Sequence, residues 1–365
     1  MSVPKLEIIN LRKVFGNGSV VAVDGIDFTI EAGETVALLG PSGCGKSTTL
    51  NMIVGLEDPT SGDIRIDGRS VVGVPAGKRN VGLVFQDYAV FTHMTVFENL
   101  AFGLVIRGRP KAEITRAVHD VAELLGMQKS LKLPAAELGG SELQRVAIGR
   151  TLVTKPAILL LDEPLSNLEA SARLAMRREL RRLQSEIGLT IIYVTHDQIE
   201  ALSLADRIAV MNAGKLQQIE RSSVICEKPD HVFVAGFMGS PPMNLLRGEI
   251  ARDGAFTGFR RESLFIQLPP GEMVSSGRAG QPIILGVRPE SLKLALADES
   301  MIFGKVTIVE PRGPEAVVTV EAGAISLKAV VLAAGRPQEG SNVGLIADPS
   351  SFVFFSGETG RRLAS

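Results

Sequence analysis

The stretch GPSGCGKST, residues 40–48, decides the fold of this chain. It follows the apolar run ETVALLG (34–40) and opens into TTLNMIVGL (48–56), which has the composition of a helix. Glycines in such a turn allow successive backbone N–H groups to curl around phosphate oxygens, and the positive end of the helix then faces the anion. The pattern therefore predicts a phosphate-binding loop. Its expected nucleotide-binding residues are Gly40, Pro41, Ser42, Gly43, Cys44, Gly45, Lys46, Ser47 and Thr48.

A second polar segment, LLLDEP (159–164), ends another apolar strand with two acidic residues. A carboxylate at such a strand end, beside a phosphate loop, can hold Mg²⁺ through water, and this nucleotide-site role is the one we predict for Asp162. The Ser47 hydroxyl is expected to ligate the same ion, and Lys46 to reach the terminal phosphates. Glu163 then stands where it can polarise an attacking water as a general base. The alternative is a structural acidic pair that caps the strand.

Two further polar residues lie near strand ends. Gln86 in VGLVFQDYAVF (81–91) can ligate Mg²⁺ or an attacking water, and His196 in IIYVTHDQ (191–198) can hydrogen-bond a γ-phosphate. A lone His or Gln at a strand end is more often structural, so both assignments depend on the whole constellation. The predicted catalytic set is Glu163, His196 and Gln86, and the predicted metal set is Ser47, Gln86 and Asp162.

Strand-like apolar runs alternate with helical patterns through about residue 235. This alternation predicts a mainly parallel sheet. The buried runs are ETVALLG (34–40), AILLLDEP (157–164) and TIIYVTHD (190–197), with a helix predicted at 171–188 and ended by Gly188. LEIINLRKVF (6–15) and GDIRIDG (62–68) are more typical of edge or antiparallel strands. After a turn-forming linker at 239–242, strand-length pieces separated by Gly, Pro and Asp predict a small all-β barrel.

The composition of this 365-residue chain limits its partners and its compartment. The length is sufficient for two or three domains. A formal net charge of −1 gives no basic field of the kind that binds nucleic acid, so no nucleic-acid partner is expected. Two cysteines, Cys44 and Cys226, cannot form a disulfide framework and favour a reduced, cytosolic setting. No apolar run approaches the ~18 residues of a membrane span, and no signal peptide is expected.

Taken together, these motifs resemble those of the ATP-binding cassette (ABC) family over about residues 5–237. The phosphate loop, Gln86, a signature region at 138–142, the Asp162–Glu163 pair and His196 follow the order of the family. The resemblance implies an α/β fold: a P-loop NTPase ABC cassette at 1–237 with an antiparallel β subdomain and a helical subdomain at about 88–155. It also implies a C-terminal all-β OB-like (TOBE-type) accessory domain at 238–365, and ATP and Mg²⁺ as cofactors.

Two further regions gain a role from the resemblance. Phe15, in LRKVFG, matches the aromatic residue that stacks on adenine, with a buried core Phe as the alternative. The segment AVFTHMTVFENLAFGL (89–104) implies an apolar groove for a helix of a membrane-spanning subunit. Some residues of this groove would instead belong to the subdomain core, and the sequence leaves open which. The groove residues are Val90, Phe91, Met94, Val96, Phe97 and Leu100.

The signature region departs from the family pattern. Where the family has Leu-Ser-Gly-Gly-Gln, this chain has Leu138-Gly139-Gly140-Ser141-Glu142. In the family, this motif completes the ATP site of the neighbouring chain from a helix N-terminus. Gly139 removes a hydroxyl donor, Ser141 adds a side chain, and Glu142 adds negative charge. The residues for the chain's own site are intact, which indicates an asymmetric heterodimer with a second cassette. A homodimer that tolerates the changes is the alternative.

The tail narrows the resemblance further. FMGSPPMNLLRG (237–248), LGVRPESLKL (285–294) and VEPRGPEA (309–316) are similar to the accessory domain of bacterial carbohydrate and polyol importer ATPases, such as those for maltose and sn-glycerol-3-phosphate. The likeness implies a peripheral ATPase subunit at the cytoplasmic face of the inner membrane, bound to two membrane-spanning permease subunits. An extracytoplasmic solute-binding protein would supply a sugar, glycerol or glycerol-3-phosphate. The rival interpretations are a non-transport ABC ATPase and a regulatory subunit that rarely hydrolyses ATP.

Overall fold

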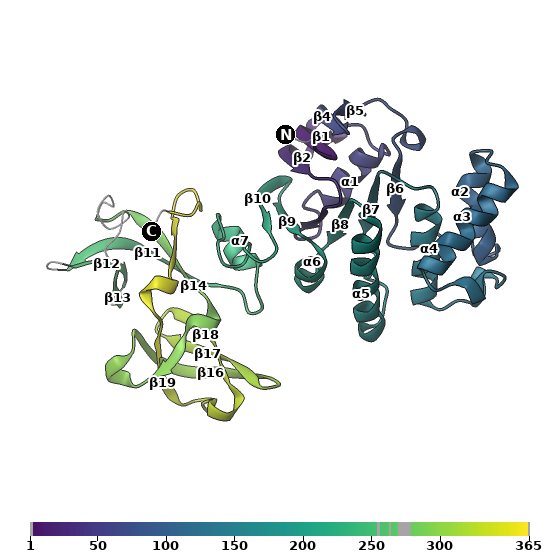
Figure 1. Ribbon diagram of the computed structural model, residues 1–365. Coiled ribbons are helices and arrows are strands. Elements are labelled where there is room, and N and C mark those ends of the chain that lie inside the picture. The colour runs from purple at the N-terminus through teal and green to yellow at the C-terminus, as the bar shows by residue number, and fades with distance from the viewer. Residues whose placement is uncertain (1–2, 254–255, 263, 269–278, 364–365) are drawn as a thin grey trace. The chain divides into compact units, whose positions relative to one another are not determined.

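The computed structural model describes residues 3–253, 256–262, 264–268 and 279–363 of the chain. It divides into two compact units, Met1–Val224 and Ile225–Ser365. The division falls earlier than the boundary expected after residue 237, because Ala235 of α7 (Val232–Phe237) packs in a cluster of the second unit. In Figure 1 the first unit runs from purple to teal and the second from green to yellow.

An antiparallel sheet forms the beginning of the first unit (Figure 1). Its strand order is β2-β1-β4-β5. Leu6, Ile8 and Leu11 of β1 are buried while the residues between them are more exposed, as in a sheet with one buried face. The expected antiparallel strands are confirmed, since β1 pairs antiparallel with both β2 and β4. The strands are β1 (Leu6–Phe15), β2 (Val20–Ile30), β4 (Ser61–Ile66) and β5 (Arg69–Ser70).

The central sheet of the first unit has the order β10-β9-β3-β8-β7-β6. Its strands are β3 (Thr35–Leu39), β6 (Val81–Val84), β7 (Ile158–Asp162), β8 (Ile191–Thr195), β9 (Arg207–Asn212) and β10 (Lys215–Arg221). Five strands are parallel, and β10 joins β9 antiparallel. Every residue of β3 and β8 is buried, which explains their uninterrupted apolar sequences. The predicted parallel sheet is therefore confirmed, and its strands deliver their carboxyl ends to one edge.

Helices flank this sheet (Figure 1). They are α1 (Lys46–Val54), α2 (Val96–Ile106), α3 (Lys111–Leu124), α4 (Gly140–Leu152), α5 (Ala170–Ile187) and α6 (Gln198–Leu204). Thr95 begins α2 with a capping box, because its hydroxyl accepts the Glu98 N–H while the Glu98 carboxylate accepts the Thr95 N–H. α5 ends at Gly188, whose positive φ of 66° is left-handed, as the sequence predicts. Helices α2, α3 and α4 pack together as the expected helical subdomain.

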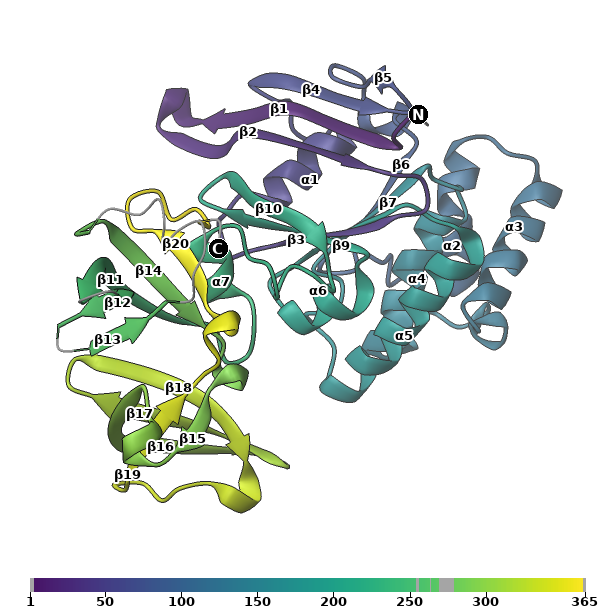
Figure 2. The same ribbon diagram turned by 60° about the vertical axis from the view of Figure 1, so that its left-hand side comes forward.

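The second unit consists mainly of two five-stranded antiparallel sheets, both labelled in Figure 2. One has the order β13-β12-β11-β14-β20, and the other β15-β19-β16-β17-β18. Leu246 and Leu285 of the first sheet share a core with Val306 and Val318 of the second. The predicted all-β accessory domain is confirmed. The strands are β11 (Asn244–Asp253), β12 (Phe256–Arg261), β13 (Leu264–Gln267), β14 (Pro282–Val287), β15 (Lys293–Ala295), β16 (Ile302–Arg312), β17 (Glu315–Ala322), β18 (Ile325–Leu332), β19 (Asn342–Ile346) and β20 (Val353–Ser356).

Candidate active site

The phosphate loop lies between the end of β3 and the start of α1, as predicted. Gly45 has a φ of +104°, and a Cβ there would lie 2.4 Å from the Ala22 carbonyl oxygen. A Cβ on Gly40 would lie 2.3 Å from the Met211 carbonyl oxygen. Only glycine fits these two positions, because the neighbouring atoms belong to backbone. Lys46 is 5% exposed, and its ammonium donates to the carbonyls of Gly40 at 2.8 Å and Pro41 at 2.9 Å.

The chain brings two of the three predicted magnesium ligands together. The Ser47 hydroxyl, at the start of α1, donates to Oδ1 of Asp162, at the carboxyl end of β7, over 3.2 Å. Burial raises the pKa of Asp162, while the Ser47 hydrogen bond lowers it. Mg²⁺ binds through one or two carboxylates plus phosphate oxygens and water, and this hydroxyl–carboxylate pair fits that chemistry. Within the described residues no larger acidic, His or Cys cluster could hold a metal.

Glu163 and His196 form the centre of the predicted catalytic set. Their side chains meet between Nδ1 of His196 and Oε2 of Glu163, at 3.1 Å. The Glu163 side chain is 22% exposed and that of His196 is 58% exposed, so solvent and ligand reach both. The backbone of Glu163 has a φ of 43°, which is uncommon for a residue with a side chain. Such strain is typical of positions held for a functional reason.

Gln86 lies on the segment that follows β6, beside the segment that follows β7. Its carbonyl oxygen accepts a hydrogen bond of 2.9 Å from Nδ2 of Asn167. Over the part of the chain that the structure describes, its side chain makes no hydrogen bond to Ser47 or Asp162. The structure therefore brings the Gln86 backbone to the same edge of the sheet, and the role of its side chain as a metal ligand stays a prediction.

Phe15 lies at the end of β1, and 37% of its surface is exposed. The Lys13 ammonium lies 4.8 Å from the centre of its ring. The alternative of a buried core Phe is therefore wrong. An exposed aromatic face beside a cation is available for stacking on a planar base.

The altered signature region begins helix α4. Gly139 is the N-cap, with φ and ψ of −74° and 165°, and Leu138 and Gln144 on either side of the region are buried. The Glu142 carboxylate folds back and accepts the Gly139 N–H at 3.1 Å. Gly140 and Ser141 follow in the first turn. The sequence indicated that Glu142 adds charge here, but not that its carboxylate occupies the anion-binding end of its own helix.

Sequence reasoning missed two polar residues behind the Glu163–His196 pair. Glu200 is 4% exposed on α6, and Arg173 on α5 lies near it. The sequence carries a signal only for Glu200, which is an acidic residue next to apolar Ala201 in the short helix that follows His196. In the structure, Ala201 is fully buried. An acidic residue at such a position needs a buried partner.

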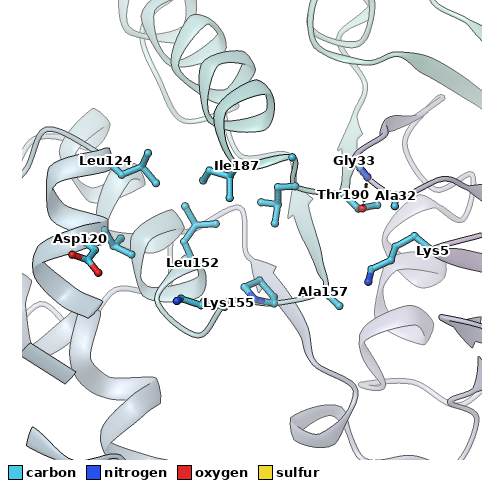
Figure 3. A pocket seen from close by; sticks show the side chains of 14 residues that line it. Lys5, Ala32, Gly33, Asp120, Leu124, Leu152, Lys155, Ala157, Ile187 and Thr190 are labelled. Carbon is cyan, nitrogen blue, oxygen red and sulfur yellow. Dashed lines mark hydrogen bonds between the residues drawn. The ribbon is translucent and has the colours of Figure 1, made fainter. Parts of the chain in front are cut away.

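A separate cavity of about 650 Å³ lies at the opposite edge of the central sheet (Figure 3). Ala157 and Thr190 border it just before β7 and β8 begin, and Leu124 and Leu152 contribute apolar surface from the helical subdomain. The Thr190 hydroxyl accepts the Gly33 N–H there at 2.9 Å. Ligands of parallel α/β sheets bind at the carboxyl ends of the strands, so this cavity is not part of the candidate active site.

An apolar groove is present in the helical subdomain, and two of the six residues named for it, Met94 and Phe97, line it. A groove of about 370 Å³ is lined by Met94, Phe97 and Phe102, among others. Val96 and Leu100 are fully buried. These two residues therefore belong to the core of the subdomain, which is the alternative that the sequence left open for some of the six.

The fold and the site together define a P-loop ATPase. The N-terminus of α1 follows a glycine-rich loop, and the Ser47 hydroxyl meets the Asp162 carboxylate beside it. Glu163, the next residue along the chain, contacts His196. Comparisons with known proteins agree. The pattern of the ABC transporter family matches residues 23–166, that of the MalK OB fold domain matches 239–292, and that of the TOBE domain matches 285–355.

Relatives match over nearly the whole chain. The trehalose/maltose import ATP-binding protein MalK of Thermococcus litoralis is 42% identical over 98% of this chain and 99% of its own length. The sn-glycerol-3-phosphate import ATP-binding protein UgpC of Bordetella avium is 44% identical over 86% and 84%. A solved structure of cbiO1 from Clostridium perfringens, part of the ABC transporter complex cbiONQ, has a TM-score of 0.57 and 30% identity over 61% of this chain and 90% of that one.

The chain belongs to the ABC transporter family, as an ATPase subunit that uses ATP with Mg²⁺ and drives solute import. No helix within the described ranges is both long and apolar enough to cross a membrane.

Proposed function

We propose that this chain powers a bacterial importer for a carbohydrate or polyol, such as a sugar, glycerol or glycerol-3-phosphate. The names of its relatives support this, since they specify trehalose/maltose import and sn-glycerol-3-phosphate import. In the proposal, two membrane-spanning permease subunits hold the chain at the cytoplasmic face of the inner membrane, and an extracytoplasmic solute-binding protein supplies the solute. The apolar groove beside Met94 and Phe97 offers a permease helix its contact.

The proximity of Glu163 to His196, beside the Ser47–Asp162 pair, is the observation that carries the hydrolytic role. Residues 40–48 hold the phosphates through their N–H groups and the Lys46 ammonium. Ser47 and Asp162 hold Mg²⁺, which when bound screens the negative charge of the phosphates. Gln86, on the segment that follows β6, is the third proposed ligand of this ion.

In the same proposal, Glu163 accepts a proton from the attacking water, or orients that water. Its strained backbone and the nearby imidazole fix the direction of its carboxylate. His196 keeps Glu163 in place and donates to the γ-phosphate. Phe15 stacks on adenine with the face that it exposes.

We also infer that the chain pairs with a second cassette whose signature is unaltered. The supporting contact is the 3.1 Å hydrogen bond from the Gly139 N–H to Glu142. A carboxylate at this helix end repels the phosphate that the neighbouring chain would bring to it, and it occupies a donor that the phosphate needs. The pair would then contain one competent and one impaired ATP site.

Two measurements test the proposal. Purified alone, the chain should bind ATP but hydrolyse it slowly, and hydrolysis should rise when a co-encoded second cassette is added. Robust hydrolysis by the chain alone would instead support a homodimer. For import, the complex with its permeases and binding protein should be rebuilt in vesicles and supplied with maltose, glycerol or glycerol-3-phosphate. ATP hydrolysis without uptake of any of them would favour the non-transport or regulatory alternatives.

A further inference from the structure

A buried carboxylate lies directly behind the proposed catalytic pair. Glu200 is 4% exposed and belongs to the first turn of α6. Its Oε2 atom accepts hydrogen bonds from the Tyr193 hydroxyl at 2.8 Å and from the Thr195 hydroxyl at 2.9 Å. Both donors belong to β8, the strand whose end carries His196. One carboxylate oxygen of Glu200 therefore holds the carboxyl end of β8 through two hydrogen bonds.

The Thr195 hydroxyl helps to fix the backbone on both sides of His196. It donates to Glu200, and it accepts the N–H of Asp197 at 3.0 Å. Asp197 in turn caps α6, because its carboxylate accepts the N–H of Ile199 at 2.7 Å. The residue before His196 and the residue after it are thus both fixed, and the direction in which the imidazole leaves the backbone depends on these contacts.

The other oxygen of Glu200 is directed at a second loop. Nε of Arg173 lies 3.9 Å from Oε1 of Glu200, and the same guanidinium donates from its NH2 group to the Leu168 carbonyl at 3.1 Å. Leu168 is buried in the turn that follows Glu163. A single buried carboxylate therefore connects the segment behind Glu163 with the segment that carries His196.

The surroundings keep this carboxylate where it is. Burial and the neighbouring Glu200 carboxylate raise the pKa of Tyr193 well above its usual range, so its hydroxyl remains a donor. The Arg173 Nε atom is itself buried and has no hydrogen bond among the described residues, which leaves the charge of Glu200 as its nearest compensation. Replacing Arg173 would leave the buried Glu200 carboxylate without this neighbouring positive charge.

We infer that Glu200 is a positioning residue of the ATPase reaction, which sets the geometry of His196 and Glu163 through Thr195 and Arg173. The inference rests on the proposed roles of those two residues. Glu200 is buried and hydrogen-bonded within the protein, so we expect it to touch neither the nucleotide nor the reacting atoms. Its loss should therefore leave ATP affinity unchanged and slow the chemical step, because misplacing a catalytic group by about 1 Å can cost about 100-fold in rate.

The test is Glu200→Gln in the full-length chain, assembled with its permeases and second cassette. We expect kcat to fall by about 10- to 100-fold while the KM for ATP keeps its wild-type value. In the His196→Ala background, adding Glu200→Gln should lower the rate by a smaller factor than it does in the wild type, because the part of its effect that passes through His196 is already lost. An unchanged kcat, or losses that multiply in the double variant, would overturn the inference.

Matched variants separate positioning from stability. Thr195→Val keeps the shape of the side chain and removes only the hydroxyl, so it should reproduce the loss of kcat even where Glu200→Gln folds poorly. Glu34→Gln is the control, since Glu34 is also largely buried beside an arginine, with Arg207 at 3.3 Å, but it precedes β3 at the end opposite to the phosphate loop. It should lower the melting temperature and leave kcat unchanged. A wild-type complex that hydrolyses no ATP would count against the proposed function instead.

Discussion

Restoring the family signature in this chain should raise its ATPase activity and lower its stability. The variant carries Gly139→Ser, Ser141→Gly and Glu142→Gln. A Cβ on Gly139 would have Glu142 Oε2 at 3.8 Å as its nearest neighbour, and its φ of −74° is ordinary, so serine enters without strain. Serine is a better N-cap than glycine by only a few tenths of a kcal/mol, so it offsets part of the stability that is lost with the Glu142 carboxylate. The opposite signs of the two effects make the prediction specific.

The gain in activity follows from the donors that each neighbouring ATP site regains. A hydrogen bond to a charged group contributes about 1.5–3 kcal/mol, which corresponds to about 10- to 150-fold if it forms in the transition state. Removing the Glu142 carboxylate also frees the Gly139 N–H, which it now occupies at 3.1 Å. Phosphate release by the purified chain, without any second cassette, is the assay.

The loss of stability follows from the same contact. A carboxylate at a helix N-terminus contributes about 0.3–1 kcal/mol, so Glu142→Gln alone should lower the melting temperature by about 1–4 °C. Glu137→Gln is the control, because it removes a charge from the preceding turn without capping α4. If the restored chain hydrolyses ATP no faster than the wild type, the signature is not what limits this chain, and the reasoning fails.

Three further outcomes follow from the site and its support. Glu163→Gln should lower kcat by about 10²- to 10⁴-fold while equilibrium dialysis shows unchanged ATP binding, and a smaller loss would exclude it as the general base. Asp162→Asn should raise the melting temperature of the ligand-free chain at pH 7. Because the folded pKa of Asp162 is raised, its contribution is favourable below the ordinary value of 3.8 and is lost as the pH rises, so the difference should shrink in acid. Asn99→Ala should lower the free energy of unfolding in urea by about 1–3 kcal/mol, because fully buried Asn99 accepts the Phe91 N–H and donates to the Phe91 carbonyl. An unchanged unfolding midpoint would show that water replaces those bonds.

Local patterns were sufficient to predict the elements that hold the phosphate site. The buried strands β3, β7 and β8 are mainly apolar runs. β7 and β8 end in polar residues and β3 leads into the glycine-rich loop, so strand and site could be read together. Gly188 ended α5 where expected, because a left-handed helix end favours glycine.

What could not be predicted depends on contacts between distant segments. The burial of Val96 and Leu100 follows from the way α2 packs on α4. Because α2 is apolar over most of its length, its sequence does not show which face is buried. The Glu200 network joins residues from β8, α5 and α6, and no spacing in the sequence indicates that these residues contact one another. The hydrogen bond from the Gly139 N–H to Glu142 is half of a capping box, a motif that can be recognised in a sequence. It was missed because the motif usually begins with serine or threonine, and this chain has glycine there.

The backbone packing around the phosphate loop has a consequence for how this chain can diverge. Gly45 lies against the carbonyl of Ala22 and Gly40 against that of Met211, while the Gly214 N–H donates to the Cys44 carbonyl at 3.1 Å. Carbonyl and amide groups are present whatever residue is encoded, provided that proline does not replace the donor. Point substitutions in β2 and in the β9–β10 hairpin can therefore accumulate without loosening the loop, except at Gly214, whose φ of +77° favours glycine. A one-residue insertion or deletion would shift the supporting groups themselves, so lineages of this chain should vary in composition there far more freely than in length.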